Sequence, residues 1–303
     1  MRVGLTGASG FIGGALIAAL RERGDHVTPF VRPTSTKPDG PVVRWDPSRG
    51  FVDEQDLRRA GGFDAVVHLA GAGIADKRWS VERKREILES RTQSTSLLVS
   101  ALEGMPSGTD LLASGSAIGY YGSRGDEVLD EESSRGDGFL ADVCAQWEAA
   151  ATPFARNGAR LAFLRTGVVM SRHGGALKKQ LPLFRVGVGG QLSNGQQWLS
   201  PISLRDEVRA ILWILDQQLT GPVNLVAPEP VKNKIFSKIL SIEIHRPTFA
   251  RIPAFALKIA LGSELATQAV LASQRVIPRN LEVSGFTFEN PSSEAIISEA
   301  LHS

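Results

Sequence analysis

Apolar runs of strand length alternate with amphipathic stretches of helical length along the first half of the chain. The apolar runs cover residues 2–6, 26–31, 42–45, 65–69, 110–113 and 160–165. The amphipathic stretches cover residues 12–23, 81–102 and 140–156. In the first of these, Ile12, Leu16 and Leu20 fall on one helical face. Because strands that alternate with helices form βαβ units, we expect an α/β fold with a doubly wound parallel sheet.

The pattern changes after Thr166. Glycines at 174–175 and 187–190 predict long loops around residues 177–184. The run at 110–113 is likewise expected to end in a turn, because glycine and serine follow it. The later predicted elements are a helix over residues 203–216 and a strand over residues 221–226. The remainder is helix-rich and interrupted by prolines.

This change in pattern divides the chain into two predicted domains. We expect residues 1–170, together with about 196–226, to form the sheet domain. We expect about 171–195 and 227–303 to form a smaller, helix-rich domain that caps the sheet.

Composition excludes several classes of protein. The chain has 303 residues, of which 42% are hydrophobic and 22% charged, and its net charge is +2. A charge so close to zero creates no field for nucleic acid or an anionic membrane, and the apolar runs are too short to cross a bilayer. A single cysteine, Cys144, excludes internal disulfides and multi-cysteine metal sites. We expect a cytoplasmic protein without a signal peptide or bound metal, either monomeric or homodimeric.

The most specific motif is the glycine-rich turn between the first strand and the first helix, at residues 7–13. In this context it predicts dinucleotide binding. Gly7 permits the tight turn, Gly10 lets the backbone approach a pyrophosphate, and Gly13 lets the helix pack closely. The helix N-terminus favours the anion. Ser9, Phe11 and Ile12 complete the predicted contact segment.

The end of the second predicted strand indicates which cofactor is bound. An acidic residue at this position usually binds the ribose diol of NAD, and a basic residue accommodates the 2′-phosphate of NADP. Here the strand ends in Phe30-Val31-Arg32. The guanidinium of Arg32 suits a phosphate, although a solvated surface arginine is the alternative. We therefore predict NADP(H).

Several motifs resemble the extended short-chain dehydrogenases/reductases (SDRs). Gly10-Phe11-Ile12-Gly13 resembles their GFIG, and Leu69-Ala70-Gly71 after His68 resembles the segment that lines the adenosine side of the cofactor. Ser114-Gly115-Ser116-Ala117, followed by Tyr121-Gly122, resembles the segment after the fifth strand, and Ser114 is expected to contact the cofactor. Further matches, among them Ser90-Arg91-Thr92, Trp147-Glu148 and Gln274-Arg275-Val276-Ile277-Pro278, point to an atypical branch, the epimerase family proteins. The resemblance implies a Rossmann fold with a C-terminal substrate-type domain and NADP(H) as ligand.

The resemblance also implies where catalysis would take place. Ser116 stands at the position of the SDR serine, but Leu140 and Cys144 stand where the proton-transferring Tyr and its Lys are usual. Ser116 is either substrate-facing or a turn hydroxyl. Tyr121 is a candidate proton donor, with packing of its loop as the alternative. Cys144 is interpreted as a packing residue rather than a reactive thiol.

Arg165, Gly167 and Val168 are expected at the nicotinamide end of the sheet, with Gly167 allowing close approach of the ring.

Two functions remain open. Hydride transfer needs only the cofactor and a well-held carbon atom. The first hypothesis is therefore an NADP(H)-dependent oxidoreductase or epimerase acting on a small carbonyl or alcohol substrate, which can be sugar-nucleotide-like. The absent Tyr and Lys motivate the second, a catalytically weak or inactive NADP(H) sensor or regulator.

Overall fold

One mostly parallel sheet forms the centre of the molecule. The computed structural model describes residues 1–35, 40–105, 108–217, 219–247 and 250–302. Its main sheet has eight strands in the order β13-β8-β6-β5-β1-β2-β3-β4, and only β4 runs antiparallel to its neighbour. These strands are β1 (Arg2–Thr6), β2 (His26–Val31), β3 (Val43–Asp46), β4 (Phe51–Val52), β5 (Phe63–His68), β6 (Thr109–Ala117), β8 (Arg160–Thr166) and β13 (Gly221–Leu225).

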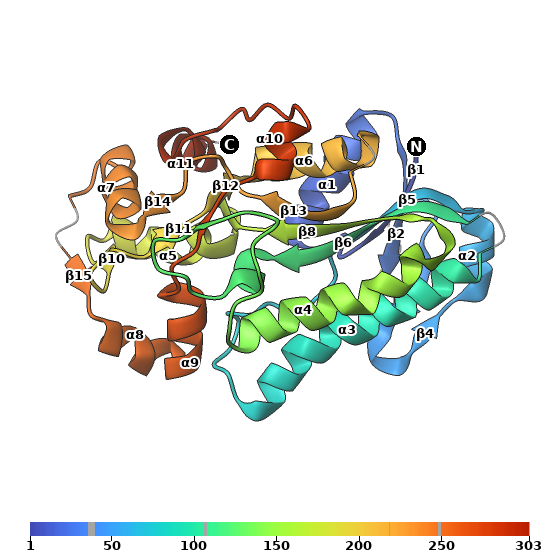
Figure 1. The fold of residues 1–303 in the computed structure, drawn as a ribbon, viewed down its shortest axis with the longest axis horizontal. Coiled ribbons are helices and arrows are strands. Elements are labelled where there is room, and N and C mark those ends of the chain that lie inside the picture. The colour runs from blue at the N-terminus through green and yellow to red at the C-terminus, as the bar shows by residue number, and fades with distance from the viewer. Residues whose placement is uncertain (36–39, 106–107, 218, 248–249, 303) are drawn as a thin grey trace.

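Helices cover both faces of this sheet (Figure 1). On one face lie α1 (Phe11–Glu22) and α6 (Leu204–Asp216), and on the other α3 (Val81–Glu103) and α4 (Phe139–Ala151). Val67 packs in the core on the α1 side, and its neighbour Val66 packs in the core on the α3 side. This alternation follows from the two-residue period of a strand. The predicted doubly wound α/β fold is confirmed.

The order of the strands places a ligand site. The chain adds β2 and β3 on one side of β1, then returns to add β5 on the other side. In open parallel sheets, ligands bind beyond the carboxyl ends of the strands at such a switch point. Here that point lies where β1 ends at Thr6 and β5 ends at His68.

Two local predictions are wrong. Residues around 177–184 form helix α5 (Gly175–Arg185) rather than a loop. Leu177, Leu181 and Phe184 are buried on one face of α5, so tertiary packing stabilises a helix that glycines and an internal proline had obscured. Strand β6 also continues through Ser116 instead of turning after residue 113, because β5 and β8 pair with it on both sides.

A second hydrophobic core forms beyond the carboxyl ends of the strands, at the end of the molecule opposite the N-terminus (Figure 1). Helix α5 packs there with α7 (Asn233–Glu243) and α11 (Ser293–His302). The remaining α-helices are α2 (Glu54–Ala60), α8 (Ala254–Leu261), α9 (Ser263–Leu265) and α10 (Arg279–Val283). The short strands are β7 (Val128–Leu129), β9 (Val168–Ser171), β10 (Gly190–Leu192), β11 (Trp198–Leu199), β12 (Pro201–Ser203), β14 (Val231–Lys232), β15 (Ala250–Ile252) and β16 (Arg275–Val276).

Within the described ranges, no helix is both long and apolar enough to span a membrane. The same residues contain no group of three or more His, Cys, Asp or Glu side chains placed to hold a metal ion.

Candidate cofactor pocket and polar network

The glycine-rich turn joins β1 to α1 beside the segment that follows β5. Gly7 has a φ of +68°, and a Cβ on it would lie 2.8 Å from the carbonyl atoms of Leu69. A Cβ on Gly13 would lie 2.2 Å from the carbonyl oxygen of Gly7. Only glycine avoids these collisions. No side chain caps α1 at Gly10, so its first N–H groups remain available to an anion.

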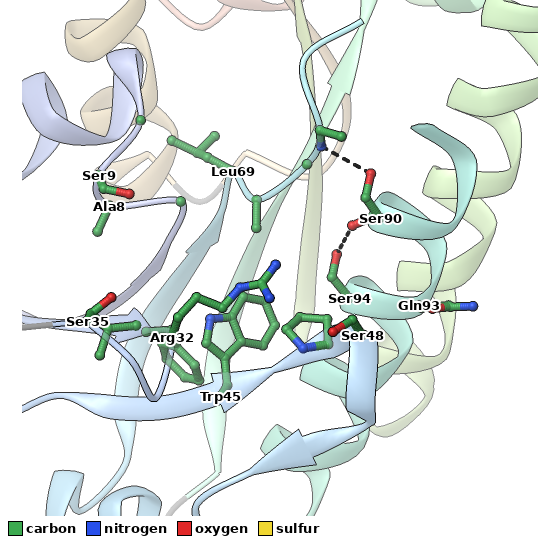
Figure 2. Close-up of a pocket in the computed structure, with 18 of the residues that line it drawn as sticks. Ala8, Ser9, Arg32, Ser35, Trp45, Ser48, Leu69, Ser90, Gln93 and Ser94 are labelled. Atoms are coloured by element: carbon green, nitrogen blue, oxygen red, sulfur yellow. Dashed lines mark hydrogen bonds between the residues drawn. The ribbon is translucent and has the colours of Figure 1, made fainter. Parts of the chain in front are cut away.

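A pocket of about 560 Å³ opens beside this turn. Figure 2 shows Ala8 and Ser9 of the turn on one side, Leu69 from the segment after β5, and Ser90, Gln93 and Ser94 of α3 on the opposite side. Several predicted cofactor contacts line this one cavity, which is a suitable size for a nucleotide. They are Gly7, Ser9, Gly10, Arg32, Leu69, Ala70 and Gly71.

Arg32 lies in this pocket beside Trp45 (Figure 2). Its side chain is 61% exposed, and Nη1 donates a hydrogen bond to Asp46 Oδ1 at 3.0 Å. Asp46 also accepts hydrogen bonds from the backbone and hydroxyl of Ser48. These hydrogen bonds and the positive charge of Arg32 hold the pKa of Asp46 below its usual value. The pocket therefore contains an exposed guanidinium with donors left for a phosphate.

A buried histidine organises the segment after β5. Thr6 Oγ1 accepts hydrogen bonds from the backbone N–H groups of Leu69 and Ala70 and lies 2.7 Å from His68 Nδ1. Burial lowers the pKa of His68 to about 3, so its ring is neutral. Since the Thr6 hydroxyl already accepts twice, it donates to Nδ1, and His68 Nε2 donates to Thr95 Oγ1 at 3.0 Å. This network holds the wall of the pocket in place.

Ser116 belongs to a buried polar network where the carboxyl ends of β6 and β8 meet α4. Its hydroxyl donates to Glu148 Oε1 at 2.7 Å. The guanidinium of Arg165 donates to both carboxylate oxygens of Glu148, each at 2.9 Å. All three residues are less than 10% exposed. Ion pairs of this bidentate kind have fixed geometry, so the direction of the Ser116 hydroxyl is set by the protein.

The structure argues against the predicted role of Tyr121 as proton donor. Its side chain is fully buried, and its hydroxyl donates to Asn224 Oδ1 and accepts from Arg165. Burial raises the pKa of Tyr121 to about 12, although the nearby charge of Arg165 opposes this rise. A phenol of that pKa with both directions of hydrogen bonding in use is a poor proton donor. Tyr121 instead links Arg165 to Asn224 of β13.

Leu140 and Cys144 lie on α4 where a catalytic Tyr and Lys would be expected from the resemblance. Both side chains face Gly119 in the turn after β6. Cys144 is buried, and burial raises the pKa of its thiol to about 12. A thiol in this state is inert, as expected for a packing residue. The chain thus has no Tyr–Lys pair at this helix.

The other predicted contacts lie elsewhere. Ser114 is fully buried, and its hydroxyl has no hydrogen-bond partner among the described residues. A Cβ on Gly167 would lie 2.6 Å from Ser200 O and from Val226 Cγ1, so packing of the chain itself accounts for this glycine. Phe11, Ile12 and Val168 do not line the 560 Å³ pocket.

Sequence reasoning did not predict the polar contacts that depend on long-range pairing. Glu148 and Asn224 carry no local motif that assigns them a partner. Only the pairing of β6, β8 and β13 brings Ser116, Arg165 and Asn224 together, and α4 then adds Glu148. The signal available in the sequence was a charged glutamate on the face of a predicted helix that is expected to pack against the sheet.

Comparison with known proteins identifies a family of nucleotide-dependent enzymes. The model of the NAD dependent epimerase/dehydratase family matches residues 3–226, and a domain of unknown function, DUF1731, matches residues 252–300. The epimerase family protein of Mycobacterium tuberculosis is 42% identical over 289 residues, which cover 95% of this chain and 93% of the relative.

Two solved structures are similar. Human epimerase family protein SDR39U1, crystallised with NADPH, is 30% identical with a TM-score of 0.89, and the match covers 99% of each chain. A nucleoside-diphosphate sugar epimerase of Corynebacterium glutamicum is 36% identical with a TM-score of 0.79, covering 99% of this chain and 58% of that one. The chain therefore belongs to the NAD dependent epimerase/dehydratase family, within its epimerase family proteins that carry a C-terminal DUF1731 domain.

Proposed function

We propose that this chain binds NADP(H) in the pocket beside the glycine-rich turn and acts as an oxidoreductase or epimerase on a small alcohol or carbonyl compound. One observation carries the choice of cofactor: Arg32 places an exposed guanidinium in the pocket formed by Gly7, Ser9 and Gly10. An arginine here suits a 2′-phosphate. The NADPH bound by human SDR39U1 supports the same choice.

Ser116 is the residue we propose to contact the oxygen of the substrate. Because its hydrogen points to Glu148, its oxygen has lone pairs free to accept a hydrogen bond. When an alcohol is oxidised, its hydroxyl proton passes to Ser116 Oγ while the proton of Ser116 passes to Glu148. The hydride of the same carbon would need an acceptor, which bound NADP⁺ would supply, and the substrate would become a carbonyl compound. The part of the protein is to move the proton, through Ser116 and Glu148.

A second function rests on a different observation. Leu140 and Cys144 cannot transfer a proton or provide a fixed cation, and Tyr121 is buried. A chain that retains the cofactor pocket without these groups can act as an NADP(H) sensor. This function requires different affinities for the two redox forms, since a ligand shifts an equilibrium only by differential binding.

A labelling experiment separates the two functions. NADPH with deuterium at the transferable position is incubated with the protein and a metabolite extract, and products that gain the label are sought by mass spectrometry. A parallel incubation with unlabelled NADP⁺ follows the appearance of NADPH absorbance, which detects alcohol oxidation. Label transfer or NADPH formation that is lost in Ser116→Ala supports the enzyme. Tight binding of NADPH without either signal, and with weaker binding of NADP⁺, supports the sensor.

A further inference from the structure

Arg91 on α3 carries a partly buried positive charge that no carboxylate of the described residues neutralises. Its Nη1 donates to the backbone oxygens of Ala72 and Ile87, each at 3.0 Å, and its guanidinium carbon lies 5.0 Å from the ring centre of Trp147. Burial lowers the pKa of Arg91 below the ordinary value for arginine. Among the described residues, its Nε and Nη2 groups form no hydrogen bond, and it has no ion pair. Charges removed from water are normally paired, so this guanidinium is suited to an anionic or hydroxyl-rich ligand.

Arg91 lies against the wall of the cofactor pocket. A Cβ on Gly71 would lie 3.3 Å from both Cγ and Cζ of Arg91, so the side chain occupies the space that this glycine leaves open. Gly71, Ala72 and Ser90 all line the pocket, and Ser90 Oγ accepts a hydrogen bond from the backbone N–H of Ala72. Arg91 itself is not among the residues that line this cavity, so its guanidinium lies behind Gly71 and extends toward Trp147 of α4.

The same guanidinium acts on Cys144. Burial raises the pKa of this thiol, and the positive charge of Arg91 opposes that rise. Trp147, which contacts the guanidinium, lies one helical turn after Cys144 on α4. Arg91 thus brings a cation from α3 to the neighbourhood of the α4 position where the resemblance expects a lysine.

We propose that Arg91 takes over the cofactor-binding role of the missing lysine and binds the ribose–phosphate of the nicotinamide half of NADP(H). Its free Nε and Nη2 donors provide hydrogen bonds to ribose hydroxyl or phosphate oxygens, and its charge attracts the phosphate. This inference rests on the proposed binding of NADP(H). It adds a second cation to the site: Arg32 binds the adenosine half, and Arg91 binds the nicotinamide half.

The experiment uses one ligand for each half of the pocket. Titration calorimetry measures the dissociation constants of NADPH and of adenosine 2′,5′-bisphosphate, which has the 2′-phosphate but lacks the nicotinamide half. Arg91→Gln is expected to weaken NADPH binding about tenfold, the effect of losing one charge-assisted contact, and to leave the bisphosphate unchanged. Arg32→Ala is expected to weaken both ligands. Arg85→Gln, which removes an exposed charge from the same helix, is the matched control and is expected to change neither.

Each other outcome has a separate meaning. An equal loss of affinity for NADPH and for the bisphosphate in Arg91→Gln would overturn the proposal. Arg91 would then affect binding only by supporting the wall of the pocket. Unchanged NADPH binding in this variant would overturn it as well. If Arg91→Gln fails to fold, Arg91→Lys retains the charge and is expected to weaken NADPH selectively. A wild-type protein that binds neither ligand would instead refute the proposed function.

Discussion

The hydroxyl of Ser116 donates to Glu148 Oε1 at 2.7 Å, and Arg165 holds both oxygens of that carboxylate. A serine at the SDR position is thus connected to a buried acid instead of to a Tyr–Lys pair. The contact determines the direction in which Ser116 can act, because a hydroxyl that donates to a carboxylate is left to accept from the substrate.

We expect Ser116→Ala to reduce turnover of the identified substrate by about a hundredfold or more, the usual contribution of a positioned proton-transfer group. NADPH affinity is expected to stay unchanged, because Ser116 does not line the cofactor pocket. Steady-state kinetics and calorimetry measure the two effects. Cys144→Ala is the control and is expected to retain turnover. Full activity in Ser116→Ala would remove this residue from the proposed mechanism.

Glu148→Gln is expected to lower the free energy of unfolding by about 3–5 kcal/mol, because it leaves the buried charge of Arg165 without its partner. Urea denaturation followed by circular dichroism measures this loss. Glu127→Gln breaks an exposed ion pair with Arg124 and is expected to cost about 1 kcal/mol or less. Similar losses in the two variants would contradict a structural role for the Glu148–Arg165 pair.

Arg32→Ala is expected to weaken NADPH binding by about tenfold to a hundredfold and to leave NADH binding nearly unchanged, since only NADPH has the 2′-phosphate. Arg49→Ala provides the control, because Arg49 is 83% exposed and contacts the same Asp46 at 3.6 Å. Asp46→Asn is expected to strengthen NADPH binding, because it releases Arg32 from an ion pair. An equal loss of affinity for NADPH and NADH in Arg32→Ala would show that Arg32 does not bind the 2′-phosphate.

Gly13→Ala is expected to destabilise the protein and to weaken NADPH binding, because its Cβ would lie 2.2 Å from Gly7 O and displace the turn. The neighbouring Gly14 has open space at this position, with its nearest atom 4.0 Å away. Gly14→Ala is therefore expected to stabilise the protein by about 0.5–1 kcal/mol through helix propensity. Thermal unfolding with and without NADPH compares the two variants. If both behave alike, the collision at Gly13 is not what requires a glycine.

Glu207 makes stability depend on pH. It is fully buried on α6, and burial raises its pKa to about 8, although a hydrogen bond from Thr166 opposes this rise. Between about pH 4.5 and pH 8 the folded state retains this proton and the unfolded state loses it, so the free energy of unfolding falls as pH rises. Glu207→Gln removes this titration. Its stability relative to wild type should increase by about 1.4 kcal/mol per pH unit across that window. Denaturation curves at pH 5, 6.5 and 8 measure the difference, and a constant difference would contradict the raised pKa.

The sequence by itself determined the features that depend on neighbouring residues. Alternating strands and helices predicted the doubly wound sheet, because the periods of two and 3.6 residues are local. The turn at residues 7–13 could be recognised for the same reason, because Gly10 and Gly13 both avoid Gly7 O within the turn itself. The role of Arg32 as a phosphate ligand was predicted from its position at the end of a strand.

Only the tertiary structure decided the polar network and the helix at residues 175–185. Ser116, Glu148, Arg165 and Asn224 are far apart in sequence, and strand pairing brings them together where water is excluded. No local pattern could show that Tyr121 is buried between Arg165 and Asn224, or that Arg91 lies beside Gly71. Burial depends on the whole fold, and it sets both the pKa of a side chain and whether a ligand can reach it.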